Sequence, residues 1–213
     1  MTQFHKMKLF DIHTHNTGTE EDLSIISCED YIIGKEISIG IHPWHIDDNW
    51  KKQFCTIKKN ASKENVRAIG ECGIDKAKST SGIEVQKEVF KAHAYLAEET
   101  RKPLIIHCVK GMDEIIAIRK EIMPKQPWII HGFRGKPQQA EQFINTGLYI
   151  SFGEKFNIES IKNIPTERLF IESDDCRISI HEIYKRIAET RCCSVTELAT
   201  AIMKNAETCN LLP

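Results

Sequence analysis

Histidines and acidic residues recur in this chain directly after short apolar runs. The stretches LFDIHTH, AIGECG, PLIIHC, WIIHG and LFIESD all follow this pattern, and their polar residues include His13, His15, Glu71, His107, His131 and Asp174. Imidazole and carboxylate groups without thiolates suit zinc, manganese or magnesium ions, and affinity alone does not choose among these metals. The recurrence predicts a divalent-metal site to which several segments contribute.

The spacing of these residues is that of repeated strand–helix units. Glu71 and His107 are 36 residues apart and His107 and His131 are 24 apart, each about the length of one βα unit. At positions i and i+2 of a strand, His13 and His15 project from the same face. Because the carboxyl ends of all strands in a parallel barrel open on one rim, residues far apart in the sequence can converge there.

The number of candidate ligands exceeds the need of one ion. Four imidazoles and two carboxylates are more than a single tetrahedral ion takes. We therefore expect two divalent ions (Mg, Mn or Zn) bridged by a carboxylate. Such a pair activates a water molecule and stabilises both the attacking and the leaving oxygen of a hydrolysis reaction.

Strand-like runs alternate with helix-length stretches along most of the chain. The strand candidates are residues 8–12, 36–41, 66–70, 103–107, 128–131, 148–152 and 169–172, with a weaker candidate at 23–27. The helix candidates include 85–96, 113–121, 137–145 and 194–206. This alternation, regular from residue 66 onward, predicts βαβ units, a parallel sheet and one α/β domain over residues 1–213.

The first third of the chain breaks this alternation. Only the seven residues 16–22 separate the first strand from the candidate at 23–27, whereas a parallel crossover usually needs a dozen or more. Either the first helix has been lost or this part is an irregular loop. We expect the barrel to be irregular or shortened within the segment 16–36.

The composition limits what the chain can attract and where it can work. Of 213 residues, 28% are charged, and the formal net charge of −1 gives no broad field for nucleic acid, so a phosphate-bearing substrate would be bound locally. Eight cysteines without a CxxC pair predict a reduced, cytoplasmic protein. No apolar run is long enough for a secretory leader or a membrane span, so we expect no membrane partner.

Several conspicuous residues have an ordinary structural explanation. His5, His45, His93 and His181 do not end a strand candidate, so we interpret them as structural. The lysines between residues 51 and 63 lack interleaved aromatic residues and suit a solvated helix face. His42 is intermediate, because it ends a strand candidate but precedes Pro43 in a turn-like sequence.

The ordered set of motifs resembles the TatD family of metal-dependent deoxyribonucleases. DIHTH is similar to the family's DxHxH signature, GIHPW to its GxHP and GECGID to its GExGxD. IIHCVKG, IIHGFRG and LFIESDD are similar to the later histidine and ETDxP segments, and Asn205 lies in a stretch similar to the terminal helix. The resemblance runs nearly end to end, whereas the HxH pair alone would be shared with several amidohydrolase-like families.

The resemblance implies a TIM-type (β/α) barrel with a two-metal phosphodiesterase site. It implies one ion on His13, His15, Glu71 and Asp174, and a second ion on Glu71, His107 and His131. Glu71 would bridge the ions, and Asp174 would orient and deprotonate the attacking water, which makes both catalytic. The substrate it implies is DNA, cleaved near an end as a 3′→5′ exonuclease.

The chain departs from the family pattern at three places. Val109, followed by Lys110, stands where the family often has an arginine, and SDDCR replaces TDxP with loss of the proline. The segment between the first two motifs is short by about one helix. All six ligands are retained, whereas the substrate groove can differ. The candidate substrate contacts are His42, Lys110, Arg134 and Arg177, and exposed salt bridges are the alternative for the three cations.

Two other functions fit the same residues. An amidohydrolase-like enzyme could use the site on a small lactone, amide or phosphoester, and the near-neutral charge and shortened rim are compatible with it. A non-catalytic barrel could retain metals for stability or partner binding. The presence of Asp174 beside the other ligands favours chemistry.

Overall fold

Eight parallel strands form a single sheet whose spatial order follows the chain. The computed structural model describes residues 8–16 and 22–213, and the strands that neighbour one another in its sheet, from β1 to β8, are consecutive in the chain. The strands are β1 Phe10–Thr14, β2 Leu23–Cys28, β3 Ile37–Ile39, β4 Val66–Asp75, β5 Leu104–Val109, β6 Trp128–Ile130, β7 Tyr149–Phe152 and β8 Leu169–Ile171. The predicted strand at 23–27 is therefore confirmed as β2.

The sheet closes on itself through a short contact between the last and the first strand. Thr14 forms an isolated parallel bridge with Asp174. Asp174 N donates to His13 O at 2.9 Å, and His15 N donates to Asp174 O at 3.2 Å. These bonds complete a nearly closed parallel barrel, which confirms the predicted TIM-type fold.

A buried polar network stabilises the same joint. Asp11 is 5% exposed and accepts from Ser173 N at 3.0 Å and from Ser173 Oγ at 2.6 Å. Ser173 Oγ also lies 2.8 Å from Thr14 Oγ1. Burial raises the pKa of Asp11 to about 7, and the hydrogen bonds from Ser173 oppose that rise. The first residue of the DxHxH motif thus joins the ends of the barrel.

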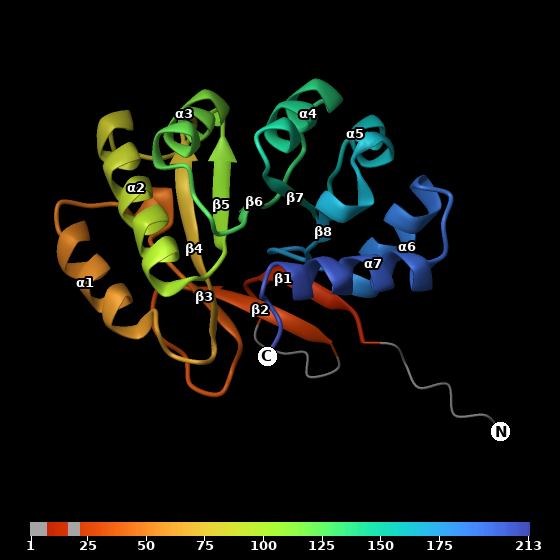
Figure 1. Cartoon of the computed structure of the whole chain (residues 1–213), viewed down its shortest axis with the longest axis horizontal. Coiled ribbons are helices and arrows are strands. Elements are labelled where there is room, and N and C mark those ends of the chain that lie inside the picture. The colour runs from red at the N-terminus through yellow and green to blue at the C-terminus, as the bar shows by residue number, and fades with distance from the viewer. Residues whose placement is uncertain (1–7, 17–21) are drawn as a thin grey trace.

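The helices cover the barrel unevenly. They are α1 Trp50–Asn60, α2 Ile83–Thr100, α3 Met112–Ile122, α4 Pro137–Asn145, α5 Ile158–Asn163, α6 Ile180–Thr190 and α7 Val195–Thr208. In Figure 1 they run from α1 at the left, over the top, to α6 at the right, and α7 lies beside β1. None of the helices in the described residues has the length and apolar character needed to cross a bilayer.

The shortened first part of the barrel extends over two connections. The described residues between β1 and β2 and the whole connection 29–36 between β2 and β3 contain no helix. β2 nevertheless pairs in parallel with both neighbours, with Phe10 opposite Leu23 and Ile26 opposite Ile37. The expectation of a shortened barrel is confirmed, and it applies to two units where the sequence suggested about one helix.

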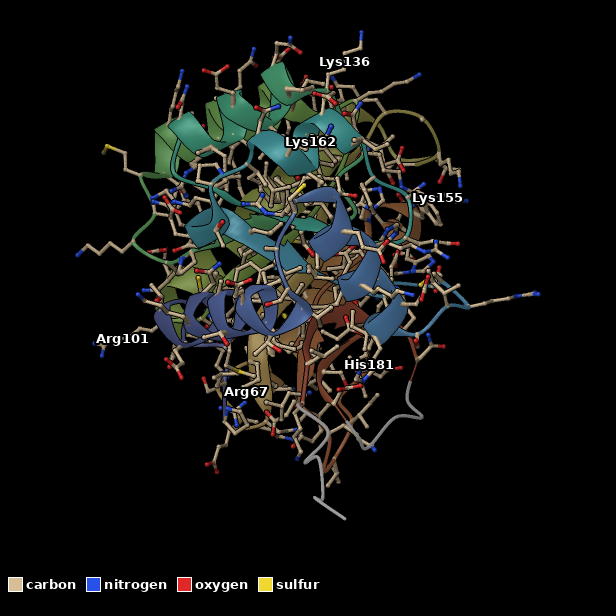
Figure 2. The ribbon with its side chains drawn as sticks, turned by 90° about the vertical axis from the view of Figure 1, so that its right-hand side faces the viewer. Arg67, Arg101, Lys136, Lys155, Lys162 and His181 are labelled. Atoms are coloured by element: carbon tan, nitrogen blue, oxygen red, sulfur yellow. The ribbon has the colours of Figure 1, made fainter. Side chains whose placement is uncertain are left out.

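The strands carry apolar side chains until they approach the carboxyl-terminal rim. Leu104–Ile106 of β5 and the three residues of β6 are buried and apolar, and His107 and His131 follow directly. Such runs suit parallel strands that are buried on both faces. Arg67 lies near the start of β4, and Lys155 lies in the loop after the end of β7, so the two residues belong to opposite ends of the barrel. Both are labelled in Figure 2, Arg67 toward the bottom and Lys155 at the right.

Candidate metal centre

Glu71 lies at the centre of a cluster of imidazoles at the carboxyl-terminal rim. Its Oε1 lies 2.7 Å from His131 Nε2, 2.8 Å from His107 Nδ1 and 3.1 Å from His42 Nε2. Its Oε2 lies 3.3 Å from His13 Nε2 and 3.7 Å from His15 Nε2. The two oxygens of one carboxylate therefore face two different groups of histidines.

Asp174 completes the group beside Oε2. Its Oδ1 lies 3.6 Å from His15 Nε2 and 3.8 Å from His13 Nε2. The side chain is 26% exposed, whereas Glu71 is 4% exposed. The structure thus gathers around one point all six predicted ligands, which lie in or directly after β1, β4, β5, β6 and β8.

The backbone of β4 brings Glu71 to this position. Sequence reasoning placed Glu71 after its strand, but β4 continues through it to Asp75. Gly70 and Gly73 adopt φ values of +132° and +152°, and the pairing of β4 with β5 shifts register between Ile69 and Cys72. A side-chain carbon at Gly73 would collide with His107 O. The GECG sequence is therefore required for the close approach of β4 to β5.

The charges at the centre depend on one another. Burial would raise the pKa of Glu71, but His131 and the hydrogen bonds from the imidazoles outweigh it and hold the pKa well below its ordinary value. Burial alone would lower the pKa of His131, but the carboxylates of Glu71 and Glu172 raise it well above the usual range. Glu71 and Glu172 thus favour a positive charge on the His131 imidazole, which both carboxylates contact.

His13 provides a test of whether the residues fit a metal. Its side chain is completely buried, and neither ring nitrogen makes a hydrogen bond, although Nε2 lies 3.3 Å from Glu71 Oε2. A buried polar atom without a partner is costly unless a ligand satisfies it. The nitrogen or oxygen atoms of His13, His15 and Asp174 lie within 4.8 Å of one another, as do those of His13, Glu71 and His131. These donors fit divalent cations on both sides of Glu71.

Two further carboxylates contact the ring nitrogens of His107 and His131 that face away from Glu71. Asp75 Oδ2 lies 3.0 Å from His107 Nε2, and Glu172 Oε1 lies 3.3 Å from His131 Nδ1. A carboxylate on the far nitrogen fixes the tautomer and leaves the near nitrogen free to act as a ligand. Sequence reasoning did not assign these roles. The signal available was that Asp75 belongs to GECGID and Glu172 to LFIESD.

His42 differs from the other histidines in its hydrogen bonds. Its Nδ1 accepts from Trp44 N at 3.1 Å, so the neutral ring carries its proton on Nε2, which faces Glu71 Oε1. Burial lowers the pKa of His42, although Glu71 opposes the change, so the neutral ring is favoured. His42 is therefore arranged as a hydrogen-bond donor.

Two cavities open beside the imidazoles. One of about 630 Å³ lies over the ends of β4, β5 and β6, and another of about 490 Å³ lies over the ends of β1, β2 and β3. Lys110 and Arg134, both exposed, line the larger cavity, whereas Arg177 is exposed and lines neither. Two of the three predicted cations thus lie at the site, and the structure does not bring Arg177 to it.

The histidines interpreted as structural lie outside the cluster. His181 Nε2 lies 3.0 Å from Asp22 Oδ2, on the side of the molecule seen in Figure 2. His45 contacts Glu29 at 2.7 Å. His93 is buried, with Nδ1 facing Val89 O at 2.8 Å, and its Nε2 accepts from Ile41 N at 3.0 Å, which fixes the residue before His42. His5 lies outside the described residues.

The barrel and its rim of histidines and carboxylates define a known class of fold. The chain is similar to the crystal structure of YJJV, a TatD homologue from Escherichia coli K12, with a TM-score of 0.77, 20% identity, and coverage of 96% of this chain and 98% of that one. At this identity the similarity supports the fold alone.

The family follows from the sequence comparison. The model of the TatD-related DNases matches residues 5–210, so the chain belongs to this family. An uncharacterized metal-dependent hydrolase of Buchnera aphidicola is 33% identical over 151 residues, which cover 67% of this chain and 57% of the relative. The 3′-5′ ssDNA/RNA exonuclease TatD of Pantoea ananatis is 32% identical over 145 residues, which cover 63% and 55%. The chain thus spans a little over half the length of these two relatives.

The acid sensitivity of the fold tests the role of His93. Burial lowers its pKa to about 4, so the unfolded chain binds a proton between about pH 6.5 and pH 4 that the folded chain excludes. This exclusion weakens the wild-type fold as the pH falls, by on the order of 3 kcal/mol. At pH 7, His93→Leu should lose about 1–3 kcal/mol because Ile41 N loses its acceptor.

Urea unfolding at pH 7 and pH 4.5 measures both effects. The difference between wild type and His93→Leu should shrink as the pH falls, because only the wild type retains the buried imidazole. Phe54→Leu is the matched control. Phe54 packs against His93, with the two ring centroids 5.0 Å apart, and its side chain does not titrate. A constant difference between wild type and His93→Leu across this range would contradict this role.

Proposed function

We propose that this chain is a metal-dependent phosphodiesterase that removes nucleotides from an end of single-stranded nucleic acid. The observation that carries the proposal is the position of Glu71, whose two oxygens face separate groups of histidines beside Asp174. Membership of the TatD-related DNase family supports hydrolysis of nucleic acid, and the name of the Buchnera aphidicola relative supports dependence on a metal. The name of the Pantoea ananatis relative supports a 3′→5′ exonuclease.

The proposed ligands follow the two sides of Glu71. One divalent ion would be held by Glu71 Oε2 with the following residues: His13, His15 and Asp174. The second would be held by Glu71 Oε1 with His107 and His131, whose far nitrogens face Asp75 and Glu172. His42 is excluded from this set because its proton lies on the nitrogen that faces the centre.

The residues of the chain divide the work of hydrolysis. When bound, divalent ions supply a water of lowered pKa and offset the charge that develops on phosphate oxygens. Asp174 is the most exposed carboxylate of the cluster, so it can orient a water molecule and accept its proton. His42 Nε2 can donate to a phosphate oxygen, which is the substrate contact predicted for it.

The charges of the two cavities support cleavage at an end. Lys78, Lys110 and Arg134 line the larger cavity. None of the described residues that line the smaller cavity is a lysine or arginine, and Glu29 lies there instead. A polyanionic strand is therefore favoured in the larger cavity, and a terminal nucleoside without a further phosphate in the smaller one.

A small ester is the second candidate substrate. The net charge of −1 and the limited volume of the smaller cavity, about 490 Å³, are compatible with an amidohydrolase-like reaction on a lactone, amide or phosphoester. Metal-dependent turnover of small esters, with no cleavage of oligonucleotides, would favour this candidate.

The cysteines bear on the compartment. All eight are unpaired, which supports the reducing cytoplasm as the compartment.

Asp174→Asn tests the proposed base. The amide keeps the size of the side chain but cannot accept the proton, so kcat on a 3′-labelled single strand should fall by roughly 10²–10⁴-fold. The reaction is followed in Mg²⁺ and in Mn²⁺. Asp175→Asn, a change at the adjacent exposed carboxylate, is the control and should stay within about threefold of wild type. Equal losses in the two variants would rule out a specific role for Asp174.

Lys110→Ala and Arg134→Ala test the path of the strand. Each variant loses one phosphate contact, so KM for a single strand should rise. The negative slope of log affinity against log salt should become shallower by about 0.7 per residue. Arg177→Ala is the matched control, because this exposed arginine lines neither cavity. The same rise in KM for Arg177→Ala would show that the cations act through overall charge.

A further inference from the structure

Trp44 is a large aromatic residue that remains exposed at the rim of the site. Its exposed fraction is 43%, whereas the other two tryptophans, Trp50 and Trp128, are 9% and 0% exposed. It lines both cavities, so it stands between them. Family resemblance assigned no role to this position. An exposed indole beside a polar centre therefore needs an explanation.

The indole is fixed rather than free to turn. Trp44 Nε1 donates to Asp75 Oδ2 at 2.6 Å, and Asp75 in turn holds His107. The ring packs against His42 with a centroid distance of 4.6 Å and an interplanar angle of 79°. The backbone N–H of Trp44 is also bound, to His42 Nδ1. Its orientation is therefore determined by the same residues that arrange the centre.

An exposed and oriented ring is suited to stacking. Unpaired nucleobases stack on aromatic side chains, and this contact tolerates any base because every base has a π face. The His107 ring centroid lies 5.9 Å from that of Trp44, so a base on Trp44 would be close to the proposed scissile phosphate. Lys78 Nζ lies 4.5 Å from the ring centroid, but this cation–π contact at an exposed site is weaker than base stacking and can be displaced.

We infer that Trp44 is the stacking platform for the nucleobase beside the scissile phosphodiester. The inference rests on the proposed function and adds the substrate feature that is read there: an unpaired base at a strand end. A duplex end keeps its terminal base stacked and paired, so it has to be opened before the base can reach Trp44.

The intrinsic fluorescence of Trp44 tests this without turnover. Asp174→Asn protein in Mg²⁺ is titrated with a short oligothymidylate and with a matched oligonucleotide whose terminal residues are abasic. Because Trp44 is the exposed tryptophan, the base-bearing strand should quench the emission and the abasic one should not. In the Trp44→Phe background the quench should disappear while affinity stays within about threefold.

Trp44→Ala separates stacking from support of the centre. Affinity for the base-bearing strand should fall by about 5- to 150-fold, and affinity for the abasic strand should not change. Trp44→Phe retains a ring but loses the bond to Asp75, so equal losses in Trp44→Phe and Trp44→Ala on both strands would overturn the inference. Binding without a quench, an equal quench by the abasic strand, or no binding would also overturn it.

The two proposals fail in different ways. If the oligothymidylate binds and quenches Trp44 but wild-type protein does not cleave it, the proposed nuclease function is wrong and the stacking site remains. If wild-type protein cleaves the strand and no quench accompanies binding, the stacking site is wrong and the nuclease function remains.

Discussion

The burial of one carboxylate governs the rest of this structure. Glu71 is 4% exposed, and an ionised group at such a position is tolerated only when opposite charge and hydrogen bonds surround it. Five imidazoles supply that environment, three facing one oxygen and two the other. The arrangement leaves His13 buried without any hydrogen-bond partner, which adds to the reasons for cations at this point. The same charge that is costly to bury is therefore the basis of the proposed chemistry.

Barrel closure and the site are one feature of the molecule. Asp174 both bridges to Thr14 across the joint and faces His13 and His15 with its side chain. Asp11 and Ser173 brace the same joint from within. The absence of helices from the described residues between β1 and β3 leaves this arrangement intact, because β2 pairs with both neighbours. The shortened part of the barrel lies under the smaller cavity, and so it shapes the cavity proposed for the terminal nucleoside.

The sequence predicted the rim of the site well and its support less well. Histidines at the ends of apolar runs are a local pattern, so His107 and His131 could be placed before the fold was known. The helix expected over residues 85–96 is confirmed within α2, but its buried face also includes the polar residues Gln86 and His93, whereas Val85 is 38% exposed. Gln86 and His93 accept from the backbone N–H groups of Asp75, at the end of β4, and of Ile41, and apolar periodicity carries no signal for such contacts. Arg177 lines neither cavity, and the sequence could not predict this because it depends on the path of the loop after β8.

Metal binding measured on the purified chain tests the central claim most directly. Elemental analysis and calorimetric titration with Mn²⁺ or Zn²⁺ should find two ions per wild-type chain. Replacing the shared ligand in Glu71→Gln should weaken both ions together, because the neutral amide offers one oxygen and no charge where the carboxylate offers two oxygens and a negative charge. A wild-type chain that binds no divalent cation, or a Glu71→Gln chain that binds two ions as tightly as wild type, would contradict the account.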